Sequence, residues 1–140
     1  MFRDEAGHEE ITRKVIGRAM RVHDAMGPVC SNRYTRNLSI ELREAHLQVE
    51  IGRRVPLIYR GHNVDSAFIP DLIVEGVVVV EVKAVERFVA VHISQVVTYL
   101  RLTGCPIGLL LNFHAASIRA GLKRVIRPDL FRAKHDRVSF

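Results

Sequence analysis

The sequence predicts an α/β fold in which one mixed central sheet is flanked by helices. Two stretches of helical periodicity come first, three strand-like segments follow, and a further helix leads into an apolar run typical of a buried strand. The resulting order, α-α-β-β-β-α-β, indicates a layered fold in which helices cover the faces of the sheet. A chain of 140 residues usually forms one core, so we expect a single domain over residues 1–140.

Two helices are predicted at the start of the chain. Apolar side chains recur at helical spacing in residues 8–26, and Gly27 and Pro28 then provide a stop. Residues 31–47 repeat the pattern after Ser31, a suitable N-cap residue. We expect the two helices to pack as a pair through their apolar side chains, which are Ile11, Val15, Ala19, Val22, Tyr34, Leu38, Leu42 and Ala45.

An antiparallel meander of three strands is predicted next. Alternating apolar residues indicate a half-buried strand within residues 49–59, and the sequence RGHN at 60–63 indicates a turn. Residues 64–74 and 77–83 are rich in β-branched side chains, and they are joined at Glu75 and Gly76.

The remaining elements add a parallel strand to this sheet. Residues 86–104 have helical spacing and end at Gly104, and the apolar run PIGLLLNF follows at residues 106–113. A helix that leads into such a run favours a crossover connection to a parallel neighbour. The sequence LKRVI at residues 122–126 predicts an edge strand.

Three charged residues stand in the segment PDLIVEGVVVVEVK, residues 70–83, where a buried hairpin should be apolar. Glu81 and Lys83 are two positions apart on a strand, so their side chains project from the same face. Asp71 lies ten positions before Glu81, and a three-residue loop EGV with Gly76 in it would place the two carboxylates opposite each other. The spacing therefore predicts a register in which Asp71 and Glu81 can share one ion.

This arrangement suits a divalent metal ion and phosphodiester hydrolysis. Two carboxylates, the main-chain carbonyl of Val82 and waters form an oxygen-donor set that favours Mg²⁺ or Mn²⁺ over zinc. Lys83 could orient or deprotonate the attacking water and offset negative charge on a phosphorane-like transition state. The alternative is a structural salt bridge between Lys83 and either carboxylate.

A polar stripe on the third predicted helix supports the same site. His92, Gln95 and Tyr99 fall on one side of a helix that follows directly from the Lys83 strand. Gln95 and Tyr99 would lie beside the metal site if this stripe faces the sheet. The alternative is that the stripe is a solvated surface.

The composition favours a polyanionic partner but does not identify it. The formal net charge is +6 and the sequence pI is about 9.9, which suits binding to phosphates or a solvated basic surface. The charged start of the chain and the absence of a long apolar run predict a cytoplasmic protein with no membrane contact. Cys30 and Cys105 have no metal-ligand spacing, so we expect both to be reduced and structural.

The PDL and EVK segments resemble the motif of the PD-(D/E)xK nuclease superfamily, whose restriction-endonuclease-like core has the same element order. The wider frame is similar to the GxxExxY protein family, a branch of that superfamily, in the segments EEITRKVIGRAMRVHDAMGP, SIEL, VPLIYRG, PDLIVEG, VVVVEVKA, HISQVVTYLRLTG and GLLLNF. The resemblance implies that Asp71 and Glu81 are metal ligands, that Lys83 is catalytic, and that Gln95 and Tyr99 form an accessory Q-x-x-x-Y element.

One departure from this pattern bears on activity. The chain has PVCSNRY where the family has Gly-x-x-Glu-x-x-Tyr, so Tyr34 is kept and Ser31 occupies the position of the glutamate. We expect a magnesium-dependent phosphodiesterase that acts on DNA in preference to RNA, weakened by this loss. The alternatives are a catalytically impaired nucleic-acid- or protein-binding module of the same fold, and an antitoxin-like subunit; a homo-oligomer or a protein partner stays open.

Overall fold

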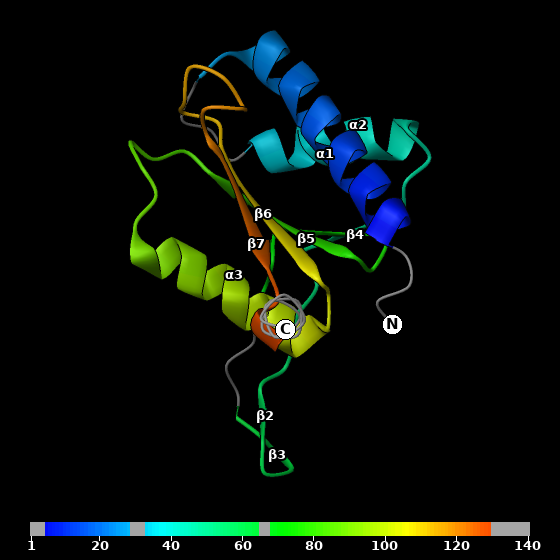
Figure 1. The fold of residues 1–140 in the computed structure, drawn as a ribbon, viewed down its shortest axis with the longest axis vertical. Coiled ribbons are helices and arrows are strands. Elements are labelled where there is room, and N and C mark those ends of the chain that lie inside the picture. The colour runs from blue at the N-terminus through cyan, green and yellow to red at the C-terminus, as the bar shows by residue number, and fades with distance from the viewer. Residues whose placement is uncertain (1–4, 29–32, 65–67, 130–140) are drawn as a thin grey trace, which may run out of the picture.

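The computed structural model describes residues 5–28, 33–64 and 68–129 as a mixed α/β fold (Figure 1). A five-stranded sheet has the strand order β1-β4-β5-β6-β7, and helices cover both of its faces. This confirms the predicted fold class. The sheet strands are β1 (Val49–Ile51), β4 (Leu72–Val74), β5 (Val78–Lys83), β6 (Ile107–Asn112) and β7 (Leu122–Ile126), and the helices are α1 (Glu5–Met26), α2 (Arg33–Glu44) and α3 (Ala90–Thr103).

Alternate residues of the central strands supply the two cores of the protein. On one face the strands pack against α1 and α2 through Leu72, Val74, Val78, Val80, Leu109 and Leu111. On the other face they pack against α3 through Ile73, Val79, Leu110 and Val125. Because β4, β5 and β6 are buried on both faces, their sequences are almost continuously apolar, and a charged side chain within them stands out.

The predicted helix pair and both helix stops are confirmed. Gly27 and Gly104 have φ angles of 71° and 78°, which end α1 and α3 in the left-handed conformation that favours glycine. The pair packs on the sheet through Tyr34, whose ring stacks on Phe113 with 4.1 Å between centroids. The predicted N-cap Ser31 lies outside the described residues, as does Cys30.

The prediction of one continuous strand over residues 49–59 is wrong. The strand β1 ends at Ile51, because Gly52 at a φ of 61° turns the chain out of the sheet. Ile58–Tyr59 (β2) and His62–Asn63 (β3) instead form a separate two-stranded ribbon. Likewise, among residues 64 and 68–74, the described part of the predicted strand 64–74, the last three join the sheet, as β4.

The register of β4 and β5 agrees with the one that the spacing predicts. Leu72 pairs with Val80 and Val74 pairs with Val78, so residues 75–77 form a three-residue loop. Glu75 and Gly76 take φ angles of 54° and 64° in that loop. The expected parallel pairing of β5 with β6 and the edge position of β7 are also confirmed.

A close approach between β6 and α3 yields a first prediction. A Cβ atom added to Gly108 would lie 2.3 Å from Cγ1 of Val96, so Gly108→Ala forces the helix away from the sheet. We expect it to lower the free energy of unfolding by about 1–3 kcal/mol, measured by urea denaturation. Gly17→Ala is the matched control: nothing lies within 4 Å of the added atom on α1, and the variant should gain about 0.5–1 kcal/mol. Equal stability of the two variants would contradict this packing.

Candidate active site

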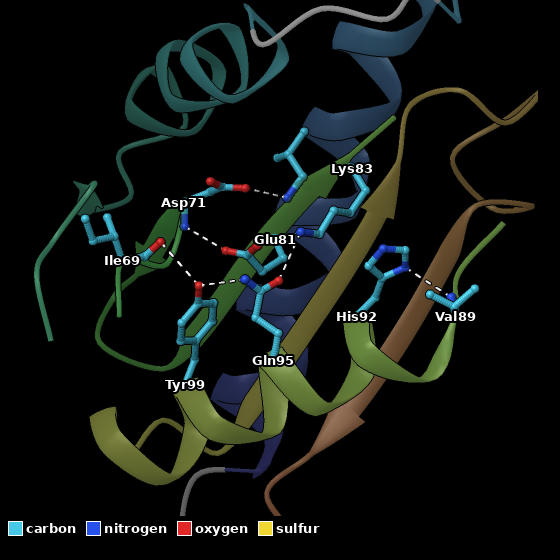
Figure 2. Close-up of polar contacts among 9 residues, drawn as sticks. Ile69, Asp71, Glu81, Lys83, Val89, His92, Gln95 and Tyr99 are labelled. Carbon is cyan, nitrogen blue, oxygen red and sulfur yellow. Dashed lines mark hydrogen bonds and ion pairs between the residues drawn. The ribbon is translucent and has the colours of Figure 1, made fainter. Parts of the chain in front are cut away.

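The three charged residues of the hairpin meet at one end of the sheet, on the face that α3 covers (Figure 2). Asp71 immediately precedes β4, and Glu81 and Lys83 lie at the end of β5. Alternate residues of a strand share a face, so Asp71 lies on the same face as Ile73, which packs against α3. By the same rule, Glu81 and Lys83 share a face with Val79, which also packs against α3. The strand period thus brings all three side chains to one side.

Two reciprocal hydrogen bonds hold the carboxylates of Asp71 and Glu81 in place. The main-chain N–H of Asp71 donates to Oε1 of Glu81 at 2.9 Å. The main-chain N–H of Val82 donates to Oδ2 of Asp71 at 2.8 Å. Each side chain is therefore bound to the strand that carries the other one, and this confirms that the two carboxylates stand opposite each other on neighbouring segments.

The main-chain carbonyl of Val82 is directed to the same side. The carbonyls of Val77 and Lys83 accept hydrogen bonds from Ile107 and Phe113, so the odd-numbered residues of β5 point their main-chain groups to β6. Neighbouring residues in a strand point these groups in opposite directions. The carbonyl of Val82 therefore points away from β6, to the side on which its N–H meets Asp71.

A chain of hydrogen bonds fixes the position of the Lys83 ammonium group. Its Nζ donates to Oε1 of Gln95 at 3.0 Å and lies 3.5 Å from Oε2 of Glu81. Because lysine can only donate, the oxygen of the Gln95 amide must face it, which leaves the amide nitrogen to donate to the hydroxyl of Tyr99 at 3.1 Å. The Tyr99 hydroxyl is then free to donate to the Ile69 carbonyl at 3.5 Å.

The polar stripe on α3 thus divides into two parts. Gln95 and Tyr99 are four residues apart and face the carboxylates, and Tyr99 is only 4% exposed, so this part is not a solvated surface. His92 lies one turn earlier, where its Nδ1 accepts the main-chain N–H of Val89 at 3.1 Å. In this contact Nδ1 acts as the acceptor, so Nε2 is the ring nitrogen that can donate.

Burial of two acidic groups in one place makes their ionisation costly. Burial, and then the negative charge of Asp71, raise the pKa of Glu81 to about 7. Burial also raises the pKa of Asp71, although the Val82 N–H and the charge of Lys83 act against the shift. Burial and the two carboxylates raise the pKa of Tyr99 to about 12, so its hydroxyl stays protonated.

The chemistry of these groups fits a hard divalent cation. The available donors are two carboxylates and one carbonyl, all of them oxygen, and Mg²⁺ is commonly held by one or two carboxylates with waters completing its shell. Burial and the negative charge of Asp71 raise the pKa of Glu81, and a bound cation would counteract both more fully than the single ammonium group at 3.5 Å does. In residues 5–28, 33–64 and 68–129 there is no cluster of three or more His, Cys, Asp or Glu side chains that could hold a metal.

Sequence reasoning missed the part played by Asn112, which is buried at the end of β6. Its Nδ2 donates to the carbonyl of Val85 at 2.7 Å and its Oδ1 accepts the N–H of the same residue at 3.1 Å. The side chain thus extends the pairing of β5 with β6 past Lys83 and holds the segment that leads into α3. The only signal in the sequence is a polar residue at the end of the run PIGLLLNF.

The sheet order and this cluster define a nuclease-like α/β protein, with two carboxylates and a lysine at the facing ends of a central strand pair. A comparison with known protein families agrees: the PD-(D/E)XK nuclease superfamily matches residues 9–125. The chain belongs to the PD-(D/E)XK nuclease superfamily, whose nucleases generally depend on divalent metal ions. Neither curated proteins nor solved structures give a match.

The finer assignments from the sequence stay predictions. The superfamily match does not identify the GxxExxY branch, and Ser31, the position that departs from that branch, lies outside the described residues. Among the described residues no helix has the length and apolar character needed to cross a membrane.

The shifted pKa of Glu81 gives a prediction for stability without metal. A carboxyl group whose pKa rises from 4.5 to about 7 on folding is protonated in the folded protein but ionised in the unfolded chain between these two pH values, so stability falls as the pH rises from about 4.5 to about 7 and does not fall further above it. Glu81→Gln has no proton to lose. We therefore expect its free energy of unfolding, relative to that of the wild type, to be about 2 kcal/mol higher at pH 8 than at pH 5.

The measurement is urea unfolding with a chelator present at both pH values. Glu75→Gln, in the exposed loop between β4 and β5, is the control, and its difference from the wild type should stay within about 0.5 kcal/mol at either pH. A difference between Glu81→Gln and the wild type that does not change with pH would show that Glu81 ionises as freely in the folded protein as in the unfolded chain.

Proposed function

We propose that this protein is a Mg²⁺- or Mn²⁺-dependent nuclease of the GxxExxY branch that hydrolyses phosphodiester bonds of DNA. The observation that carries the proposal is the pair of reciprocal hydrogen bonds by which Asp71 and Glu81 face each other beside Lys83. A cluster of buried charges at the end of a core strand is costly to folding, which favours a functional role for it.

The metal would be held by Asp71, Glu81 and the Val82 carbonyl. When bound, such an ion lowers the pKa of water and stabilises negative charge on a phosphate. The two hydrogen bonds from main-chain N–H groups fix one oxygen of each carboxylate, so the carboxylates are positioned before any ion arrives.

Lys83 would act directly on the reacting phosphate or on the attacking water. Its ammonium group offsets the charge that develops on the phosphorus oxygens, and its position beside Glu81 is set by Gln95. Gln95 is in turn held by Tyr99, which is anchored to the main chain at Ile69. Gln95 and Tyr99 therefore contribute to catalysis by positioning Lys83.

The central test removes the charged groups one at a time. Asp71→Ala should abolish Mn²⁺ binding in calorimetry and cleavage of plasmid DNA. Lys83→Met should lower the cleavage rate by about 100-fold or more while Mn²⁺ still binds, since the ammonium group is not a ligand. Lys14→Met, which makes the same exchange on the exposed side of α1, should leave both measurements unchanged. Full activity of Lys83→Met would contradict the proposal.

The same assay separates the alternatives. Parallel reactions with DNA and RNA show which substrate is cut. A wild-type protein that binds Mn²⁺ and DNA but cuts neither nucleic acid would instead be a binding module of this fold. A purified protein that neither binds DNA nor cuts either nucleic acid would fit an antitoxin-like subunit that functions only in a complex.

The role of Tyr99 can be tested apart from metal binding. Tyr99→Phe removes the hydroxyl that accepts from Gln95 but keeps the ring that meets Phe68 edge-on, so folding should be preserved. We expect cleavage to fall by about tenfold, a loss typical of groups that orient a catalytic residue, while the Mn²⁺ affinity stays within about twofold. A parallel loss of Mn²⁺ affinity and of rate would place Tyr99 in metal binding.

A further inference from the structure

A two-stranded ribbon projects from the protein without packing on the main sheet (Figure 1). It consists of β2 and β3, in which Ile58 pairs with Asn63 and Tyr59 pairs with His62. All four residues are exposed, and the exposed fractions of Ile58 and Tyr59 are 55% and 64%. A ribbon that buries neither face contributes little to the core, so the apolar and aromatic groups on it are available for a partner.

All arginine, lysine, aspartate and glutamate side chains in the ribbon and the residues next to it, 52–64, carry positive charge. Residues 52–64 contain three arginines and no aspartate or glutamate. Arg53 pairs with Glu50 at 3.5 Å, whereas Arg54 and Arg60 are exposed and form no ion pair within the described part of the chain. The ribbon therefore offers two arginines and an aromatic ring to solvent, the combination that binds the backbone and bases of nucleic acids.

The turn of the ribbon holds an arginine in an unfavourable conformation. Arg60 and Gly61 have φ angles of 51° and 81°, so both central residues of the turn are left-handed, as in type I′ hairpins. Asparagine, aspartate or glycine normally takes the first position, because other side chains are strained there. Local stability therefore does not favour an arginine at this tip.

The base of the ribbon is joined to the candidate active site. Val55 and Phe68 exchange main-chain hydrogen bonds of 2.8 and 3.1 Å where the two arms leave the sheet. The ring of Phe68 meets Tyr99 edge-on at 6.1 Å, and the N–H of Gly52 donates to the carbonyl of Asp71 at 3.2 Å. The base of the ribbon thus adjoins the segment that carries Asp71, while its tip projects away from the sheet.

We propose that the β2–β3 ribbon is a DNA-binding arm, in which Arg54 and Arg60 contact phosphates and Tyr59 stacks on a base or sugar. The proposal rests on the nuclease function, because that function makes DNA the partner whose charge complements the arm. A two-stranded ribbon is narrow enough to enter the major groove of a duplex, and an exposed tyrosine can also stack on a single strand. Both forms present phosphates to the arginines, whereas base faces are open to stacking only in a single strand.

Binding can be measured without cleavage. The experiment uses fluorescence anisotropy of labelled duplex and single-stranded DNA with full-length Asp71→Ala protein, at several salt concentrations. In that background, Tyr59→Ala should weaken binding by about fivefold or more, the loss of one stacked group. Arg60→Asn should weaken binding at low salt and reduce the slope of log affinity against log salt by about 1.

Arg60→Asn also separates binding from folding. Asparagine suits the left-handed position, so this variant should melt at the same temperature as its parent or higher. Arg13→Ala, which removes the same charge from the exposed side of α1, is the control and should bind DNA within about twofold of the parent.

The outcomes distinguish the arm from the nuclease. Weaker DNA binding by both ribbon variants, with Arg13→Ala unaffected, would support the arm. Unchanged binding by Arg60→Asn and Tyr59→Ala would overturn the DNA-binding arm, even if the wild type cuts DNA. Absence of metal-dependent cleavage by the wild type would overturn the nuclease function, and that assay does not involve the ribbon variants.

Discussion

The candidate site depends on the exchange of two main-chain hydrogen bonds between the start of β4 and the end of β5. At this point the ordinary ladder of the sheet is replaced, because the Asp71 N–H and the Val82 N–H donate to carboxylate side chains instead of carbonyls. Such charge-assisted hydrogen bonds are stronger than neutral ones, and they compensate part of the cost of burying acidic groups. This exchange ends the pairing of β4 with β5 and brings the two carboxylates together at the same place.

The hydrogen bonds compensate only part of the cost of burying Asp71 and Glu81, and the cost that remains favours the binding of a cation. Glu81 is 3% exposed and keeps a pKa near 7 in spite of its hydrogen bond and its lysine neighbour. A site with unbalanced negative charge attracts a cation more strongly than one whose charges are already paired. Lys83 and Glu81 do form a salt bridge, yet this pair does not neutralise the cluster. A structural salt bridge and a cation site are therefore compatible interpretations of these residues.

The sequence predicted the arrangement of Asp71, Glu81 and Lys83 better than it predicted the surrounding strands, for a physical reason. The ten-residue spacing of Asp71 and Glu81 allows one register with a three-residue loop, and strand period alone then fixes the face of each side chain. Alternation of apolar residues in 49–59 gave a wrong strand, because alternation does not show that Gly52 turns the chain away and that Ile58 stays exposed. The bonds of Asn112 to Val85 join residues 27 apart in the sequence, and no local pattern reveals them.

Topology explains why Gln95 and Tyr99 reach the carboxylates at all. A parallel partner for β5 can be reached only through a crossover, and α3 is that crossover, running between Lys83 and the start of β6. A helix that begins soon after Lys83 and packs on the same face must pass over the charged side chains. The absence of a side chain at Gly108 lets this helix lie close to the sheet. The side of α3 that faces this end of the sheet therefore has to be polar, while the rest of its buried side is apolar. In the sequence, α3 looks weakly amphipathic because polar and apolar residues share its buried side. This mixture arises because one helix covers both an apolar core and the charged side chains.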